Sequence, residues 1–150
     1  REIKKENIPE IVTNGGAKVK IICGGINGVR GPVRDIVSDP EYLDISLPVK
    51  SQFRHNVKRG HKLLAYVIEG AGNFDNAQDY TVGPENLVIF DDGDEIVIRS
   101  DTSPLRFLLI SGKPIREPVA WYGPIVMNTQ DELETAFEEY DNGTFIKHAN

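Results

Sequence analysis

The chain has 150 residues, with 23 acidic, 17 basic and three histidine side chains, so its net charge is −6 and its isoelectric point about 5.1. This length favours one domain over residues 1–150 that buries a core without a metal or disulfide. The acidic balance argues against direct nucleic-acid binding despite the local cations Lys58, Arg59 and Lys62, and no apolar run approaches the ~18 residues of a membrane span.

Six segments predict strands, because each is rich in branched or aromatic residues and is bounded by glycine, proline, asparagine or aspartate. They are residues 17–23, 42–47, 63–69, 86–90, 95–99 and 105–111. Apolar residues occupy both alternating sets of the last segment, which predicts burial on both of its faces. Gly70 and Gly72 predict a chain reversal, and residues 91–94 predict a hairpin loop. Short strands with regular turns predict an all-β antiparallel sandwich or barrel.

Residues 128–143 predict one C-terminal helix. Thr129 is a suitable N-cap, and Glu132 completes a capping box. Four apolar residues recur at helical spacing and form one stripe: Leu133, Ala136, Phe137 and Tyr140. We expect this stripe to pack on the sheet, with Phe137 at its centre buried and Glu138 in solvent.

The single cysteine, Cys23, cannot form an internal disulfide and follows an apolar run. A buried small hydrophobic side chain is the favoured interpretation, and a reactive thiol is the alternative. A lone buried cysteine fits a reducing compartment, so we expect the cytoplasm. The chain begins with Arg1 rather than methionine, which indicates either a removed tag or a piece of a longer protein.

Candidate metal ligands are sparse. His55 and His61 are six residues apart, which is not the spacing of ligands on one strand or helix. They could converge across a loop with Glu69, or they could be two ordinary surface histidines. The acidic residues 91–95 could hold a hard cation, but they lack EF-hand spacing and more simply form a solvated turn. We found no phosphate-binding loop and no nucleophile motif.

Two stretches resemble the C-terminal domain of the pirin family. One runs Ile110-Ser-Gly-Lys-Pro-Ile-Arg-Glu-Pro-Val119 and continues to Gly123-Pro-Ile-Val-Met-Asn-Thr129. The other combines Tyr42-Leu-Asp-Ile-Ser-Leu47 with Ala65-Tyr-Val-Ile-Glu-Gly70 and Gly93-Asp94. The resemblance implies a cupin-type jelly roll, one of the two barrels of a bicupin, with the C-terminal helix added.

The resemblance also implies that an iron-type metal is held in the N-terminal barrel by three histidines and one glutamate, from His-x-His and His-x-Glu motifs that this sequence lacks. In the general cupin pattern, this chain has Asn56, Lys58 and Leu63 where the first motif places its ligands. Arg99, Asp101 and Pro104 stand at the proline, glycine and histidine of the second motif. We therefore expect no catalytic, cofactor-binding or metal-binding residue in this chain.

Two functional hypotheses follow. In the first, the chain is part of a pirin that acts as an iron-dependent quercetin 2,3-dioxygenase or as a redox-responsive regulator that binds proteins. The chain would then support or gate the metal barrel, and its partner would be the N-terminal cupin domain. In the second, it is a free-standing degenerate cupin that binds a small organic ligand.

The candidate interface residues are Trp121 and Tyr122, which lie in a Pro/Gly-rich segment, together with Ile3, Ile8 and Pro9 near the presumed junction. They predict self-association or binding to the N-terminal domain. The alternative is that Trp121 plugs the end of the barrel.

Overall fold

The computed structural model describes residues 2–75 and 80–147 of the chain. These residues form two compact units, Arg1–Pro114 and Ile115–Asn150, each with its own apolar core. The single domain over residues 1–150 stays a prediction, since two compact units can belong to one folding domain. No helix in the described parts of the chain is both long and apolar enough to cross a lipid bilayer.

The first unit is built almost entirely from strands and begins with a short 3-10 helix, η1 (Lys5–Asn7). Its larger sheet has six antiparallel strands in the order β1 (Glu10–Val12), β2 (Lys18–Cys23), β5 (Glu41–Leu47), β12 (Leu105–Gly112), β7 (Lys62–Gly70) and β10 (Leu87–Phe90). Its smaller sheet has four strands in the order β6 (Ser51–Asn56), β11 (Glu95–Ser100), β8 (Gly72–Asn73) and β9 (Thr81–Val82). Between β2 and β5, β3 (Gly25–Ile26) and β4 (Val29–Arg30) form a small hairpin.

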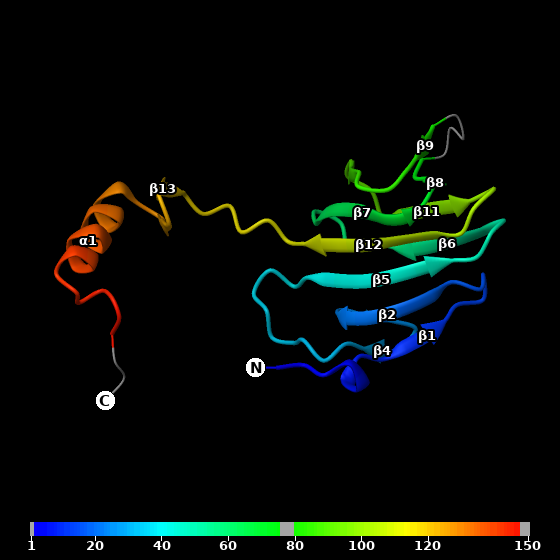
Figure 1. Ribbon diagram of the computed structural model, residues 1–150, viewed down its shortest axis with the longest axis horizontal. Helices are drawn as coiled ribbons and strands as arrows, with labels where there is room; N and C mark the ends of the chain where they lie inside the picture. Colours follow the sequence, from blue (N-terminus) through cyan, green and yellow to red (C-terminus); the bar gives the residue numbers. More distant parts are fainter. Residues whose placement is uncertain (1, 76–79, 148–150) are drawn as a thin grey trace. The chain divides into compact units, whose positions relative to one another are not determined.

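The six-stranded and the four-stranded sheet bury one shared core, and Figure 1 shows their strands. Phe53 of β6 and Phe107 of β12 meet edge to face with ring centroids 6.3 Å apart. Leu43 of β5 and Ile98 of β11 are completely buried in the same cluster. The predicted all-β sandwich is therefore confirmed.

The outer face of the larger sheet departs from the prediction. In β12, Leu105, Phe107 and Leu109 are buried, as expected for the inward set. Leu108 and Ile110 on the opposite face are only half-buried. The prediction that β12 is buried on both sides is therefore wrong, and apolar side chains remain accessible on this outer face.

Two of the connections between the sheets bear on the predicted turns. Gly70 ends β7 with a positive φ of 73°, and a Cβ there would lie 1.8 Å from the carbonyl oxygen of Pro104, so only glycine fits this reversal. Residues 91–94 do not close a hairpin as predicted, because β10 pairs with β7 in one sheet and β11 pairs with β6 and β8 in the other.

The second unit consists of the hairpin β13 (Ala120–Tyr122) and β14 (Ile125–Met127), followed by α1 (Gln130–Asp141). Both halves of the predicted capping box between Thr129 and Glu132 are present. The buried stripe residues Leu133 and Ala136 pack with Ile125 of β14, so within this unit the stripe contacts a hairpin that the sequence did not predict. Phe137 is half-buried rather than buried.

The C-terminal end of the apolar stripe on α1 is more accessible to solvent than expected. Tyr140 is exposed and meets Phe145 edge to face, with ring centroids 6.5 Å apart. Glu139 is half-buried, and its carboxylate accepts a 2.5 Å contact from the ammonium group of Lys147. The apolar face of α1 is therefore narrower than its residue spacing predicted.

Candidate functional site

A polar cluster closes the inner space of the first unit where β5 begins and β12 ends. Glu41 lies on the same strand face as the buried Leu43, so its carboxylate points inward. Ser111 is directly opposite Glu41 in the antiparallel register. His55 projects from β6 beside Phe53, with ring centroids 5.7 Å apart, which places the imidazole over the core.

These inward side chains form one network. Nε2 of His55 lies 3.1 Å from Oε2 of Glu41, with 11% and 9% of the two side chains exposed. The hydroxyl of Ser111 donates to the same carboxylate oxygen over 3.5 Å. Since buried polar groups are costly without partners, the three residues depend on one another.

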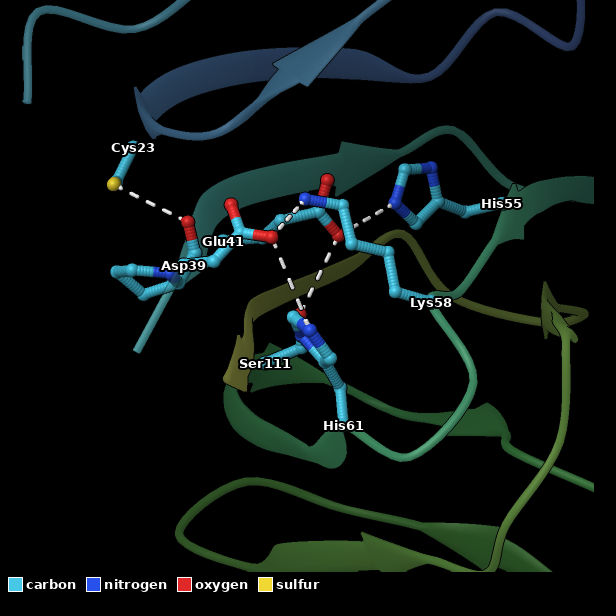
Figure 2. Close-up of polar contacts among 8 residues, drawn as sticks. Cys23, Asp39, Glu41, His55, Lys58, His61 and Ser111 are labelled. Atoms are coloured by element: carbon cyan, nitrogen blue, oxygen red, sulfur yellow. Dashed lines mark hydrogen bonds and ion pairs between the residues drawn. The ribbon is translucent and has the colours of Figure 1, made fainter. Parts of the chain in front are cut away.

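A second carboxylate stands beside the first. Oδ2 of Asp39 accepts a 2.5 Å hydrogen bond from Nζ of Lys58 and lies 3.9 Å from Nε2 of His61. Figure 2 shows the carboxylates of Asp39 and Glu41 facing the two histidines. Hydrogen bonding from Lys58 lowers the pKa of Asp39, with smaller electrostatic contributions from Lys58 and His61, so this carboxylate stays ionised at neutral pH.

His61 is the least satisfied member of the cluster. Only 8% of its side chain is exposed. Its Nδ1 is buried and has no hydrogen-bond partner among the described residues. A buried imidazole of this kind is an unusual feature in a folded chain, since most buried polar atoms are paired.

A cavity of about 580 Å³ opens beside this cluster. Its floor includes Cys23 and Glu41, and Arg30, Arg34 and Lys58 contribute cationic side chains to its lining. We call it the β2–β5 cavity, because most of its wall comes from residues 24–40, which connect these two strands. Its volume lies within the range of small-molecule sites.

The Cys23 side chain confirms the interpretation of a buried small group. It is 6% exposed, and its thiol donates to the carbonyl oxygens of Val33 at 3.4 Å and Pro40 at 3.3 Å. Burial raises the pKa of the Cys23 thiol, and the nearby negative charges of Asp39 and Glu41 raise it further. The thiol is therefore protonated at neutral pH, which argues against a nucleophilic role.

The candidate ligand cluster of His55, His61 and Glu69 forms only in part. Both histidines reach the polar cluster, where the carboxylates come from Asp39 and Glu41. Glu69 is exposed on β7 opposite Arg106 in the register of β12, and it does not join them. The sequence signal for Glu41 was an acidic residue at an inward position of a strand, directly before the alternating Leu43 and Ile45.

The residues at the cupin ligand positions do not fit an iron centre. Leu63 is part of the apolar core, Lys58 is paired with Asp39, and Asn56 is exposed at the end of β6. A leucine and an ammonium group offer no lone pair to a metal. Within residues 2–75 and 80–147, no group of three or more His, Cys, Asp or Glu side chains is placed to hold a metal ion.

The acidic loop is engaged with cations of the protein itself. A carboxylate oxygen of Asp94 accepts a 2.8 Å hydrogen bond from Arg59. Asp92 lies 3.8 Å from the ammonium group of Lys62. These pairs support the interpretation of a solvated turn rather than a cation site.

The candidate interface residues Trp121 and Tyr122 lie on β13 and expose 72% and 71% of their surface. The indole N–H of Trp121 donates to the carbonyl of Gly123 over 2.7 Å. The ring of Tyr122 meets Phe137 of α1 edge to face at 5.5 Å. The two neighbouring aromatic residues therefore differ, because among residues 115–147 a ring contact is formed by Tyr122 and not by Trp121.

Comparison with known proteins identifies close relatives. The family model for the pirin C-terminal cupin domain matches residues 42–146. An Arabidopsis thaliana protein described as pirin-like is 40% identical over 146 residues, covering 95% of this chain and 53% of that protein. Pirin-1 of the same plant is 37% identical over 145 residues, covering 95% of this chain and 50% of Pirin-1.

Structural comparison agrees. The crystal structure of quercetin 2,3-dioxygenase from Acinetobacter baumannii superposes with a TM-score of 0.83 at 27% identity, covering 95% of this chain and 49% of that one. The cupin-type sandwich with one C-terminal helix is thereby confirmed. The chain spans about half the length of the relatives that it matches.

Proposed function

Because the chain belongs to the pirin family, we propose that it is the C-terminal cupin domain of a longer bicupin and that it supports or gates an iron site in an N-terminal cupin domain. In this role the chain itself binds no metal and catalyses no reaction. The parent protein would be a quercetin 2,3-dioxygenase-like enzyme or a redox-responsive regulator that binds proteins. The share of about half that this chain covers in its relatives is consistent with a second domain of similar size.

The observation that carries this proposal is an exposed apolar surface on the larger sheet, which we call the outer sheet face. Its residues form two rows across neighbouring strands. One row is Tyr42, Ile110, Leu64 and Ile89, and the other is Leu108, Tyr66 and Leu87. Ile89 is 71% exposed and Leu87 is 53% exposed. Contiguous apolar surface of this kind marks an interaction site on a soluble protein.

The edge of the outer sheet face is polar. Arg106 donates two hydrogen bonds to the carboxylate of Asp44, from Nε at 3.0 Å and from Nη2 at 2.8 Å. An apolar centre beside an ordered ion pair resembles the core and rim of a protein interface. This supports a domain partner rather than a lipid or a small ligand at this face.

The experiment is calorimetric titration of this chain with the separately expressed N-terminal cupin domain of the same protein. We expect saturable binding that Ile89→Lys weakens by at least about tenfold, since a charge would be placed in the apolar contact. Val49→Lys is the control, because Val49 is an exposed apolar residue between β5 and β6 and lies outside the outer sheet face. No binding, or equal effects of both variants, would contradict the proposal.

The alternative, a free-standing degenerate cupin that binds a small organic ligand, is supported by the β2–β5 cavity. It would predict a chain that stays monomeric and shows no affinity for a second cupin domain. The calorimetric titration therefore separates the two roles.

A further inference from the structure

The lining of the β2–β5 cavity contains three basic and three acidic side chains, but they are not all paired with one another. Lys58 is paired with Asp39, and Glu41 is held by His55 and Ser111. Arg30 and Arg34 line the same cavity, and neither forms an ion pair with any residue in the described parts of the chain. The remaining charge in the lining is the carboxylate of Asp35.

The two guanidinium groups keep most of their hydrogen-bonding capacity. Nε of Arg34 donates to the carbonyl oxygen of Gly31 over 3.4 Å, which orients that side chain but leaves its terminal N–H groups available. Guanidinium groups bind carboxylates through paired hydrogen bonds. Two such cationic groups line this one cavity although the net charge of the chain is −6.

The cavity also offers apolar contact surface. Val29, Val33 and Ile36 contribute to its wall, and the protonated thiol of Cys23 lies in its floor. A ligand that fits this lining has a negative group for the arginines and a compact apolar body. A purely inorganic anion would leave the apolar wall without a contact.

The wall of the cavity is fixed by the backbone. Gly24 has a positive φ of 85°, and a Cβ at this position would lie 2.7 Å from Cγ of Glu41. The amide of Gly31 donates to the carbonyl of Gly24 over 3.0 Å, and the amide of Val33 donates to the carbonyl of Ile22 over 3.2 Å. The segment that carries both arginines is thus tied to β2 before any ligand arrives, as in preformed small-molecule sites.

We propose that the β2–β5 cavity binds a small organic carboxylate, with Arg30 and Arg34 on the carboxylate group and Val29, Val33 and Ile36 against the apolar body. All of these residues belong to this chain. The site therefore does not depend on a partner domain. It differs from a cupin metal centre, because its recognition rests on guanidinium groups and not on histidines.

The experiment is titration of the isotope-labelled chain with benzoate, followed by amide chemical shifts. Benzamide is the matched probe, because it has the same ring without the charge. We expect saturable shifts at Gly24, Gly25 and Gly28 with benzoate, and affinity for benzamide at least about tenfold weaker, since the charge-assisted contacts to arginine are lost. The signals of β11 should not move.

Substitutions test which charged side chains of the cavity contribute to benzoate binding. Arg30→Gln and Arg34→Gln should each weaken benzoate binding about tenfold, and Asp35→Asn should strengthen it a few-fold by removing a like charge. Arg59→Gln is the control, since Arg59 is exposed and paired with Asp94 away from the cavity. Unchanged β11 signals in each variant show that the fold is intact.

Three results would overturn the site: no saturable shift up to about 10 mM benzoate, equal affinity for benzamide, or an equal loss of affinity in Arg59→Gln. A failed benzoate titration would leave the bicupin proposal standing. Failed association with the N-terminal domain would leave the carboxylate site standing.

Discussion

The carboxylate of Glu41 lies 3.1 Å from Nε2 of His55 although β5 and β6 belong to different sheets. The pair therefore joins the two layers of the sandwich at the end where the apolar core gives way to the β2–β5 cavity. Ser111 of β12 donates a hydrogen bond to the same carboxylate oxygen, so side chains of three strands meet at this contact. A polar pair of this kind tends to fix how two layers meet rather than to add net stability, because its desolvation offsets its attraction.

Removing one member of this pair should be costly. Glu41→Ala leaves the imidazole of His55 and the hydroxyl of Ser111 buried without their acceptor, so we expect a loss of about 2–4 kcal/mol in the free energy of unfolding. Urea unfolding followed by circular dichroism measures it. Lys58→Ala, which breaks the exposed contact to Asp39, should be nearly neutral. Similar losses of unfolding free energy in both variants would mean that the cost of removing a polar partner does not depend on its burial.

The second unit should respond to truncation in proportion to burial. Leu133 is 3% exposed, so Leu133→Ala should cost about 2–4 kcal/mol. Phe137→Ala should cost less, about 1–2 kcal/mol, because its ring is half-buried and keeps mainly the edge contact with Tyr122. Glu138→Ala should be neutral. Hydrogen exchange of the α1 amides reports each loss, and a larger effect at Phe137 than at Leu133 would contradict this order.

Metal analysis tests the role of the degenerate ligand positions. Since Asn56, Lys58 and Leu63 stand where a cupin centre needs its ligands, the purified chain should carry no stoichiometric transition metal and no quercetin dioxygenase activity. Elemental analysis after dialysis is the measurement. About one iron, nickel or zinc per chain would contradict this prediction.

The main strands could be predicted from the sequence, and the reason is local. In β11, Ile96 and Ile98 lie two residues apart between Glu95 and Arg99, and they are indeed buried on one face. Strand β6 escaped prediction because Ser51–Asn56 has a single large apolar residue, Phe53, whose burial depends on Phe107 of a distant strand. Local patterning cannot show that partner.

The candidate site was harder to predict for the same reason. The sequence shows the two histidines as an unusual pair, but their carboxylates come from Asp39, just before β5, and from Glu41, the first residue of β5, whereas the candidate Glu69 lies on β7. The register that sets Ser111 opposite Glu41 spans 70 residues. Sequence spacing within one segment carries no information about such a contact.

The thiol of Cys23 should be unreactive in the folded chain. Its raised pKa keeps it protonated, and this preference stabilises the folded state below the pKa of the unfolded thiol and is lost as pH rises through the folded value. At neutral pH, alkylation by iodoacetamide should be at least about a hundredfold slower than in the urea-unfolded chain, because opening must come first. Mass spectrometry measures the rate. Equal rates in the folded and unfolded chains would show an accessible thiolate.

The last prediction separates the two exposed aromatic residues of β13. We expect the chain to self-associate or to bind the N-terminal cupin domain, and Trp121→Ala to weaken whichever occurs, because a large exposed aromatic side chain is a common interface anchor. Tyr122→Ala should instead loosen α1, since the ring of Tyr122 contacts Phe137. Sedimentation velocity measures association, and hydrogen exchange of α1 measures the loosening. A chain that stays strictly monomeric at high concentration and does not bind the N-terminal domain would favour the free-standing cupin. Loss of hydrogen-exchange protection in α1 of Trp121→Ala would instead assign Trp121 a packing role within its unit.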